Sequence, residues 1–286
     1  MDEKLSFREI FASHQGKYSD KWDSYLDVYD RVLWHLRNKP INVLEIGVLN
    51  GGSLEIWDKY FPNVLKILGI DVNPLCAELQ YESSKIKVLI GDAASEQTRE
   101  VIALESNSFS LIVDDGSHQS QDVIKTFASL FPLLDSGGVY VVEDLCCSYW
   151  MEWGGGLNLE TSATSFFKAL IDVVNFQHWG FDGVRSDVLC QFGITTSSEL
   201  EAALSRIQSV NFFNSMCVIT RQAEGTDIGS RVGAGNEQSV DQLVDVPRVI
   251  YPPPQKTKFK NRKPSLLTKI VRKFRGLMPK ISPNQA

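Results

Sequence analysis

The chain has 286 residues, 43% of them hydrophobic and 22% charged, a composition typical of a soluble globular protein with a large core. It contains no run of about 18 apolar residues, so no membrane-spanning helix is predicted, and its first residues do not resemble a secretory signal. The net charge of −6 conceals a basic segment, 256–280, with ten Lys or Arg and no acidic residue. The rest of the chain is therefore strongly acidic, which argues against a nucleic-acid-binding core.

The predicted elements alternate between short strands and helices after an expected N-terminal helical cap at 1–40. Apolar runs rich in β-branched residues indicate five buried strands: Ile41–Ile46, Ile67–Asp71, Lys87–Ile90, Ser110–Asp114 and Val139–Glu143. Helical spacing occurs between them at Ser53–Tyr60, Ser95–Leu104 and Ser120–Leu134, and Gly137-Gly138 is expected at a helix-to-strand turn. This alternation predicts a parallel sheet with helices on both faces.

The later part of the chain adds a helix at Ser165–Phe176 and two strands, Ile207–Phe213 and Met216–Thr220, in a closing antiparallel hairpin. The fold class is therefore α/β, a Rossmann-like, doubly wound and mostly parallel seven-stranded sheet with a C-terminal antiparallel hairpin. We expect one domain at 41–221, a flexible linker at 222–255 rich in Gly, Ser, Asn and Gln, and a basic amphipathic tail at 256–286.

A glycine loop and two acidic residues suggest a nucleotide-type cofactor. The first strand ends in Glu45-Ile46-Gly47, and Gly51 and Ser53 lead into the next helix, where a ligand can approach the backbone closely. Asp71 ends the second strand, where such folds place a carboxylate on ribose hydroxyls, and Asp92 follows the third. A tight turn and two helix caps are the alternative interpretation, but three such features after consecutive strands favour a cofactor site.

Acidic residues also gather after the fourth and fifth strands. The fourth ends in Asp114-Asp115-Gly116-Ser117-His118 and the fifth in Glu143-Asp144, so four carboxylates and one imidazole are expected in one crevice. Close carboxylates raise one another's pKa, and a hard divalent cation such as Mg²⁺ or Ca²⁺ would relieve that conflict. A metal also acidifies a coordinated hydroxyl, and an imidazole can accept its proton. Helix caps and solvent-facing acids are the competing interpretation.

The segment VDDGSHQSQDVIKTFASLFPLLDSGGVYVVED resembles the class I S-adenosylmethionine-dependent sugar O-methyltransferases of the macrocin and mycinamicin type, and the related family called cephalosporin hydroxylases. The resemblance extends from about Lys17 to Arg221. It implies an O-methyltransferase that uses S-adenosylmethionine and Mg²⁺. It implies metal ligation by Asp115, Glu143 and Asp144, His118 as general base, and a cofactor pocket lined by Glu45, Gly47, Asp71 and Asp92 and bordered by Asp114.

The acceptor is expected to be a sugar or glycoside, lipid-linked in one version of the hypothesis, in glycan or glycoside natural-product biosynthesis. An acceptor platform is predicted from four aromatic residues: Tyr25, Tyr149, Trp150 and Trp153. Apolar residues recur at helical spacing in 265–278 among Lys and Arg, a pattern that suits an anionic membrane surface or an acidic protein surface. Five cysteines without metal-ligand spacing indicate reduced thiols. We therefore expect a cytoplasmic protein, peripheral on the inner membrane face if the tail binds lipid, and a homo-oligomer is plausible.

Two other functions remain open at this point. One is an iron-dependent hydroxylase, although such sites normally present two His and one carboxylate, and only His118 lies in the motif. The other is a non-catalytic nucleotide- or glycan-binding protein, since a fold alone does not guarantee activity.

Overall fold

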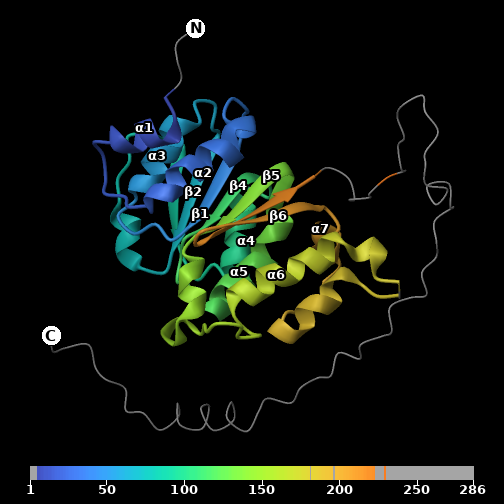
Figure 1. Ribbon diagram of the computed structural model, residues 1–286. Coiled ribbons are helices and arrows are strands. Elements are labelled where there is room, and N and C mark those ends of the chain that lie inside the picture. Colours follow the sequence, from blue (N-terminus) through green and yellow to red (C-terminus); the bar gives the residue numbers. More distant parts are fainter. Residues whose placement is uncertain (1–4, 181, 196, 223–228, 230–286) are drawn as a thin grey trace, which may run out of the picture.

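In the computed structural model, seven strands form one sheet with helices on both faces (Figure 1). The structure describes residues 5–180, 182–195, 197–222 and 229. The strand order is β3-β2-β1-β4-β5-β7-β6, in which β7 is antiparallel to both of its neighbours and the other pairs are parallel. The predicted fold class is confirmed. The strands are β1 (Asn42–Ile46), β2 (Lys66–Asp71), β3 (Ile86–Ile90), β4 (Phe109–Asp114), β5 (Leu134–Val142), β6 (Ile207–Phe213) and β7 (Met216–Arg221).

The helices divide between the two faces of the sheet (Figure 1). One face is covered by α1 (Phe7–Ala12), α2 (Asp23–Leu33) and α3 (Gly52–Tyr60), and the other by α4 (Glu96–Glu105), α5 (Ser120–Leu130), α6 (Ala163–Val174) and α7 (Ser198–Leu204). Short 3₁₀ turns lie at Trp34–Leu36, Pro74–Glu78, Phe131–Leu133, Leu145–Tyr149, Met151–Trp153, Phe176–His178 and Arg185–Phe192. Successive strand residues point to opposite faces, so Val43 packs with α1–α3 while Leu44 packs with α4–α7.

The N-terminal helices share the core of the sheet. Phe7 of α1, Tyr29 of α2 and Trp57 of α3 are each at most 1% exposed. The ring centroids of Phe7 and Tyr29 both lie 5.0 Å from that of Trp57, at distances favourable for aromatic pairs. This packing fixes the segment between α1 and α2 over the carboxyl ends of the central strands. The predicted division between a cap at 1–40 and a domain at 41–221 stays a prediction.

The structure corrects the boundary predicted between α5 and β5. The helix expected at Ser120–Leu134 ends at Leu130, and a 3₁₀ turn at Phe131–Leu133 follows it. Pro132 explains this end, because proline removes a donor and clashes with the preceding turn of a helix. Strand β5 then begins at Leu134, so Gly137-Gly138 lie within the strand rather than at a helix-to-strand turn.

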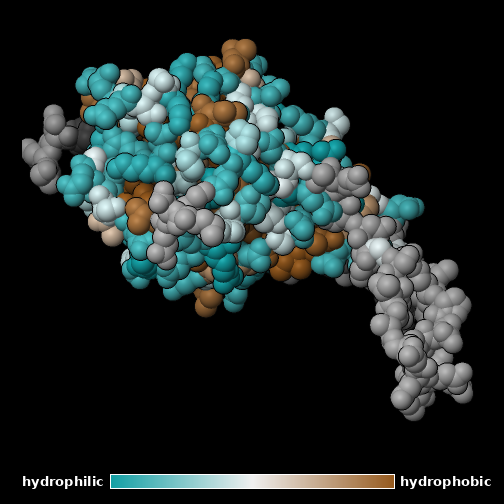
Figure 2. Space-filling view, turned by 90° about the horizontal axis from the view of Figure 1, so that it is seen from above, coloured by the Kyte–Doolittle hydropathy of each residue, from teal (hydrophilic) through white to brown (hydrophobic). Residues whose placement is uncertain are grey.

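One face of the molecule is predominantly polar. Seen from above the view of Figure 1, hydrophilic residues cover most of this face and hydrophobic residues form small, separate patches (Figure 2). Among the described residues, no helix is both long enough and apolar enough to cross a membrane. Both the predicted tail at 256–286 and all but two residues of the predicted linker at 222–255 lie outside the described residues.

Candidate active site

A cavity of about 760 Å³ opens at the carboxyl ends of the parallel strands. Its wall includes residues that follow β1, β2, β3, β4 and β5, together with 18–22 from the segment before α2. Strand order reverses between β1 and β4, and open α/β sheets bind ligands in the crevice at such a point. The volume lies in the range of small-molecule sites.

The glycine loop after β1 forms one side of this cavity. Gly47 has φ 91°, and a Cβ there would lie 2.0 Å from the backbone oxygen of Asp115, so the loops after β1 and β4 approach closely because residue 47 is glycine. The Asp71 carboxylate accepts hydrogen bonds from the backbone N–H groups of Val48 (2.8 Å) and Leu49 (3.1 Å). Asp71 therefore lines the cavity and also fixes the loop.

Three residues predicted at the cofactor, Glu45, Gly51 and Ser53, lie where β1 packs against the start of α3. Glu45 is fully buried, is not among the residues that line the cavity, and accepts hydrogen bonds from Ser53 Oγ (2.8 Å) and Trp57 Nε1 (3.2 Å). Gly51, with φ 81°, lies at the N-cap of α3, away from the cavity wall. Ser53 lines the cavity while its hydroxyl donates inward to Glu45. In this structure Glu45 anchors α3 to β1.

Two further acids predicted at the cofactor line the cavity. Asp92 lines it and accepts a hydrogen bond from the backbone N–H of Ala94 (2.9 Å), whereas Ser95 caps α4. Asp114 is 3% exposed, and its Oδ2 atom has no hydrogen-bond partner among the described residues. Burial raises the pKa of Asp114 to about 7, although the backbone N–H of Gly116 opposes this shift. An unpartnered acceptor at the cavity wall leaves room for a ligand donor.

A second group of polar atoms lies at the cavity wall around His118. His118 Nε2 is 3.8 Å from Asp115 Oδ1 and 3.8 Å from Asp144 Oδ2. One ligand atom from each of these three residues lies within 4.8 Å of the others. His118 (φ 54°) and Asp144 (φ 53°) both have left-handed backbone conformations, which non-glycine residues seldom adopt. Such strain often accompanies functional sites because the surrounding fold must maintain it.

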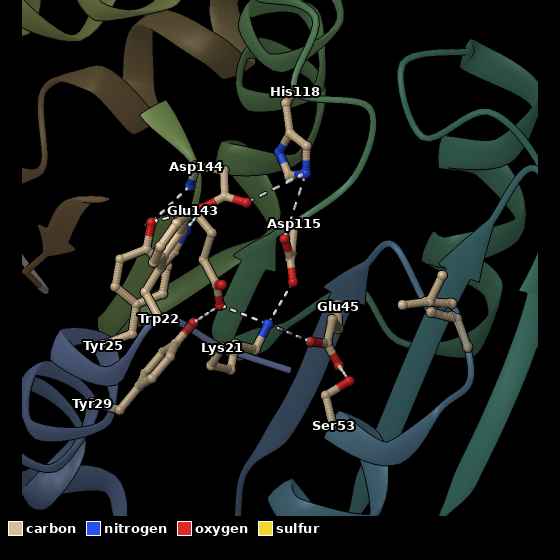
Figure 3. Close-up of polar contacts among 12 residues, drawn as sticks. Lys21, Trp22, Tyr25, Tyr29, Glu45, Ser53, Asp115, His118, Glu143 and Asp144 are labelled. Atoms are coloured by element: carbon tan, nitrogen blue, oxygen red, sulfur yellow. Dashed lines mark hydrogen bonds and ion pairs between the residues drawn. The ribbon is translucent and has the colours of Figure 1, made fainter. Parts of the chain in front are cut away.

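Lys21 was not predicted as a site residue, yet its ammonium group lies inside the acidic cluster (Figure 3). It contacts Asp115 Oδ2, lies 2.9 Å from Glu143 Oε1 and is 3.9 Å from Glu45 Oε1. The Lys21 side chain is only 3% exposed. Lys21 therefore connects the base of the glycine loop with the acids that follow β4 and β5.

Helix α2 and the residue just before it contribute three aromatic donors to the same cluster (Figure 3). Tyr29 donates to Glu143 Oε1, and Trp22, just before the helix, donates its indole N–H to Asp144 Oδ1 (2.8 Å). The Tyr25 hydroxyl lies 2.9 Å from Asp144 Oδ1, and it accepts from the Asp144 backbone N–H (3.1 Å). These contacts fix the orientation of both acids after β5.

The turn between β6 and β7 completes this wall of the site. The Ser215 carbonyl oxygen lies 2.8 Å from the Tyr25 hydroxyl and accepts from the backbone N–H of Leu145 (2.8 Å). The Ser215 hydroxyl accepts from the backbone N–H of Cys146 (3.1 Å). The hairpin turn thereby anchors the chain immediately after Asp144.

The charges within the cluster are only partly balanced. Burial raises the pKa of Glu143 to about 8 and that of Glu45 to about 7, while the Lys21 ammonium opposes both shifts. Burial also disfavours the charged form of Lys21, but the surrounding carboxylates, Glu143 foremost, raise its pKa well above the usual value. Three carboxyl groups surround this one ammonium, and a further cation would favour their ionised forms.

The four aromatic residues predicted as an acceptor platform are not together. Tyr25 is 1% exposed and supports Asp144, as described above. Trp150 and Trp153 pack edge to face with ring centroids 5.7 Å apart, and neither they nor Tyr149 line the cavity. The aromatic side chains at the cavity wall are instead Tyr18 and Trp22, which are 63% and 60% exposed. The acceptor role of Tyr149, Trp150 and Trp153 stays a prediction.

Comparison with known proteins relates this geometry to one fold. No family model matches the chain. It is 36% identical over 168 residues to mycinamicin VI 2''-O-methyltransferase of Micromonospora griseorubida, covering 55% of this chain and 41% of that protein. It is 31% identical over 211 residues to L-olivosyl-oleandolide 3-O-methyltransferase of Streptomyces antibioticus, covering 66% and 53%. The solved MycE methyltransferase of mycinamycin biosynthesis, in complex with Mg and SAH, matches with a TM-score of 0.63 and 25% identity over 78% of this chain and 55% of that one.

The domain has the class I methyltransferase fold. The chain spans about half the length of the curated sugar O-methyltransferases it matches. In this fold the cavity lies at the carboxyl ends of the strands, with the glycine loop, Asp71 and Asp92 after β1–β3 and the acidic cluster after β4 and β5. The donor set also suits a hard divalent cation, since carboxylate oxygens predominate around His118. An iron oxygenase site would need a second histidine, and no other histidine lines the cavity.

Proposed function

We propose that this chain is an O-methyltransferase that transfers the methyl group of S-adenosylmethionine to a hydroxyl of a sugar or glycoside, with a divalent metal, Mg²⁺, bound beside the acceptor. The observation that carries this proposal is the juxtaposition, in one cavity, of a nucleotide-type pocket at Asp71 and Asp92 with an acidic cluster around His118. The similarity to curated sugar O-methyltransferases supports the same assignment.

In the proposed reaction, one set of cavity residues binds the cofactor and another binds the metal and the acceptor. Asp71, Asp92 and the glycine loop would bind the nucleoside part of the cofactor, and Asp114 would border it. Asp115, Glu143 and Asp144 would hold the metal, which when bound lowers the pKa of an alcohol and orients it. His118 would accept the hydroxyl proton as the acceptor oxygen forms a bond to the methyl carbon and the sulfonium becomes a thioether. The proton ends on His118 and the positive charge leaves the sulfur, so the transfer is balanced.

Calorimetric titration with S-adenosylhomocysteine tests the cofactor half without knowledge of the acceptor. We expect saturable binding that His118→Ala leaves intact and Asp71→Ala weakens, with Asp172→Ala, an exposed change on α6, as the control. Since Asp71 also fixes the glycine loop, the thermal midpoint of Asp71→Ala is measured alongside. A folded wild-type protein that does not bind would contradict the cofactor assignment.

Transfer of a labelled methyl group to a panel of nucleotide sugars, glycosides and lipid-linked glycans, with MgCl₂, tests the catalytic half. His118→Ala should retain cofactor affinity and lose turnover, because no other imidazole lines the cavity. Unchanged turnover in His118→Ala would exclude the proposed base. Substrate oxidation with iron and without adenosylmethionine would favour the hydroxylase hypothesis instead.

We further propose that the basic tail attaches the protein to an anionic membrane surface through 265–278, which would suit a lipid-linked acceptor. Only the sequence supports this: apolar residues at helical spacing lie among four Lys or Arg. Sedimentation with phosphatidylglycerol vesicles at physiological salt should deplete the full chain but not a form ending at residue 255. Equal behaviour of the two forms would exclude the tail as an anchor. Cytoplasmic location and homo-oligomerisation stay predictions, the latter checked by light scattering.

A further inference from the structure

Lys21 belongs to a segment that the fold fixes over the acidic cluster from several directions. The backbone carbonyl of Tyr18 accepts a hydrogen bond from the Gly52 N–H (3.2 Å), and the Lys17 N–H donates to Glu55 Oε2 (2.8 Å). On the other side of Lys21, Trp22 bonds to Asp144. Because Lys21 is buried and the residues on both sides of it are anchored, its ammonium group is held in a fixed position within the cluster.

The ammonium engages carboxylates that the proposed function assigns to the metal. Glu143 Oε1 lies 2.9 Å from Lys21 Nζ, and Asp115 directs Oδ2 to Lys21 while its Oδ1 faces His118. The side chains of Lys21 and Glu143 are 3% and 2% exposed, so solvent screens this pair weakly. Two cations that need the same oxygens in a poorly screened site repel each other and divide the available charge.

Asp144 distinguishes the two cation positions. The structure gives Asp144 no contact with Lys21, and its Oδ2 faces His118. The acidic cluster therefore has an inner part around Lys21, made of Glu45, Glu143 and one oxygen of Asp115. Its outer part consists of the other oxygen of Asp115 with Asp144 and His118. Glu143 and Asp115 belong to the metal set of the proposed function and to the inner part at once.

We propose that Lys21 is a positioning residue that competes with the divalent cation for Glu143 and Asp115, and thereby sets the affinity of the site for metal. This inference rests on the proposed function for the identity of the metal ligands. Lys21 compensates the buried acids as a fixed internal cation, and a metal must share those acids with it. The site should consequently bind metal less tightly than its number of carboxylates alone would suggest.

Calorimetric titration of the full chain with MgCl₂ tests the competition directly. Lys21→Met removes the charge and keeps an unbranched chain, Lys21→Gln keeps hydrogen bonding without charge, and Lys21→Arg keeps the charge. We expect the Kd for Mg²⁺ to fall by about tenfold or more in the two neutral variants and to change little in Lys21→Arg. Lys17→Met is the matched control, because Lys17 pairs with Glu55 (2.9 Å) outside the cluster.

Thermal unfolding with and without MgCl₂ separates competition from a purely structural role. Without metal, the neutral variants should melt below the wild type, because they leave buried acids without their counter-ion. MgCl₂ should then raise their midpoints more than that of the wild type, since the metal supplies the missing positive charge. A purely structural lysine would give a loss that MgCl₂ does not restore.

The outcomes are decisive in both directions. Weaker or unchanged Mg²⁺ binding by both neutral variants, or Mg²⁺ binding by neither wild type nor variants, would overturn the competition. Mg²⁺ binding detectable only in the neutral variants would support it. If Lys21→Met does not fold even with MgCl₂, Lys21→Gln and Lys21→Arg decide by their difference in Kd. S-adenosylhomocysteine titration of the same samples reports on the proposed function separately, because that assignment fails if the folded wild type does not bind it.

Discussion

Replacing Asp114 by asparagine should stabilise the protein at alkaline pH. Asp114 is 3% exposed, its Oδ2 atom has no hydrogen-bond partner in the part of the chain that the structure describes, and burial raises its pKa from 3.8 to about 7. The native state therefore binds this proton more tightly than the unfolded chain, so the free energy of unfolding decreases as pH rises from about 4 to about 7. Asparagine keeps one acceptor for the Gly116 N–H and cannot ionise, so the free energy of unfolding of the variant does not decrease in this way.

The size of the effect follows from the two pKa values. They differ by about three, and each tenfold change in proton affinity is worth roughly 1.4 kcal/mol, so the full effect is about 4 kcal/mol. We expect Asp114→Asn to exceed the wild type in free energy of unfolding by about 4 kcal/mol at pH 8, and by only about 1–2 kcal/mol at pH 5.

Urea unfolding at the two pH values measures this difference, with a chelator present so that bound metal does not contribute. Asp172→Asn, an exposed change on α6, serves as the control and should differ from the wild type by less than about 0.5 kcal/mol at both pH values. An Asp114→Asn variant less stable than the wild type at pH 8, or equally favoured at pH 5 and pH 8, would refute this pH dependence.

Two further predictions concern the walls of the site. Tyr29→Phe removes a donor to buried Glu143 and should cost about 1–3 kcal/mol in urea unfolding. Tyr140→Phe should be neutral or stabilising, because no described residue forms a hydrogen bond with the equally buried Tyr140 hydroxyl. A comparable loss in both variants would contradict the role of the Glu143 contact. Gly52→Ala would place a methyl group 2.2 Å from the Lys17 carbonyl oxygen. We therefore expect the free energy of unfolding to decrease by about 1–3 kcal/mol and the segment before α2 to be digested faster by a protease. An unchanged digestion rate would contradict the close packing of this segment on α3.

The sheet could be predicted from the sequence because its signals are local. Each central strand is a short apolar run, and the hairpin at Ile207–Phe213 and Met216–Arg221 has a two-residue turn. The helix before β5 was predicted too long because Leu133 and Leu134 continue the apolar spacing past Pro132. Periodicity alone does not indicate where such a run changes from helix to strand.

The candidate site could be predicted only in part. The acids and His118 follow strand ends, and the fold brings these strand ends together. Their proximity could therefore be predicted from the strand assignments alone. Lys21 lies 94 residues from Asp115, and nothing in its local sequence distinguishes it from an exposed lysine. The cofactor role of Glu45 is implied by the family resemblance alone and stays a prediction, and the alternation of side chains along β1 directs Glu45 toward Trp57.

The turn at Ser215 has a consequence for the order in which the protein becomes competent during synthesis. Tyr25, near the beginning of the described chain, and Ser215, near its end, meet beside Asp144. Strand β7 also lies between β5 and β6, although it is the last of the seven in sequence. The hairpin must therefore leave the ribosome before the contacts around Asp144 can form. A nascent chain that ends before the hairpin contains His118 but lacks the Ser215 contacts. Translation itself delays assembly of the site until the whole domain has been made.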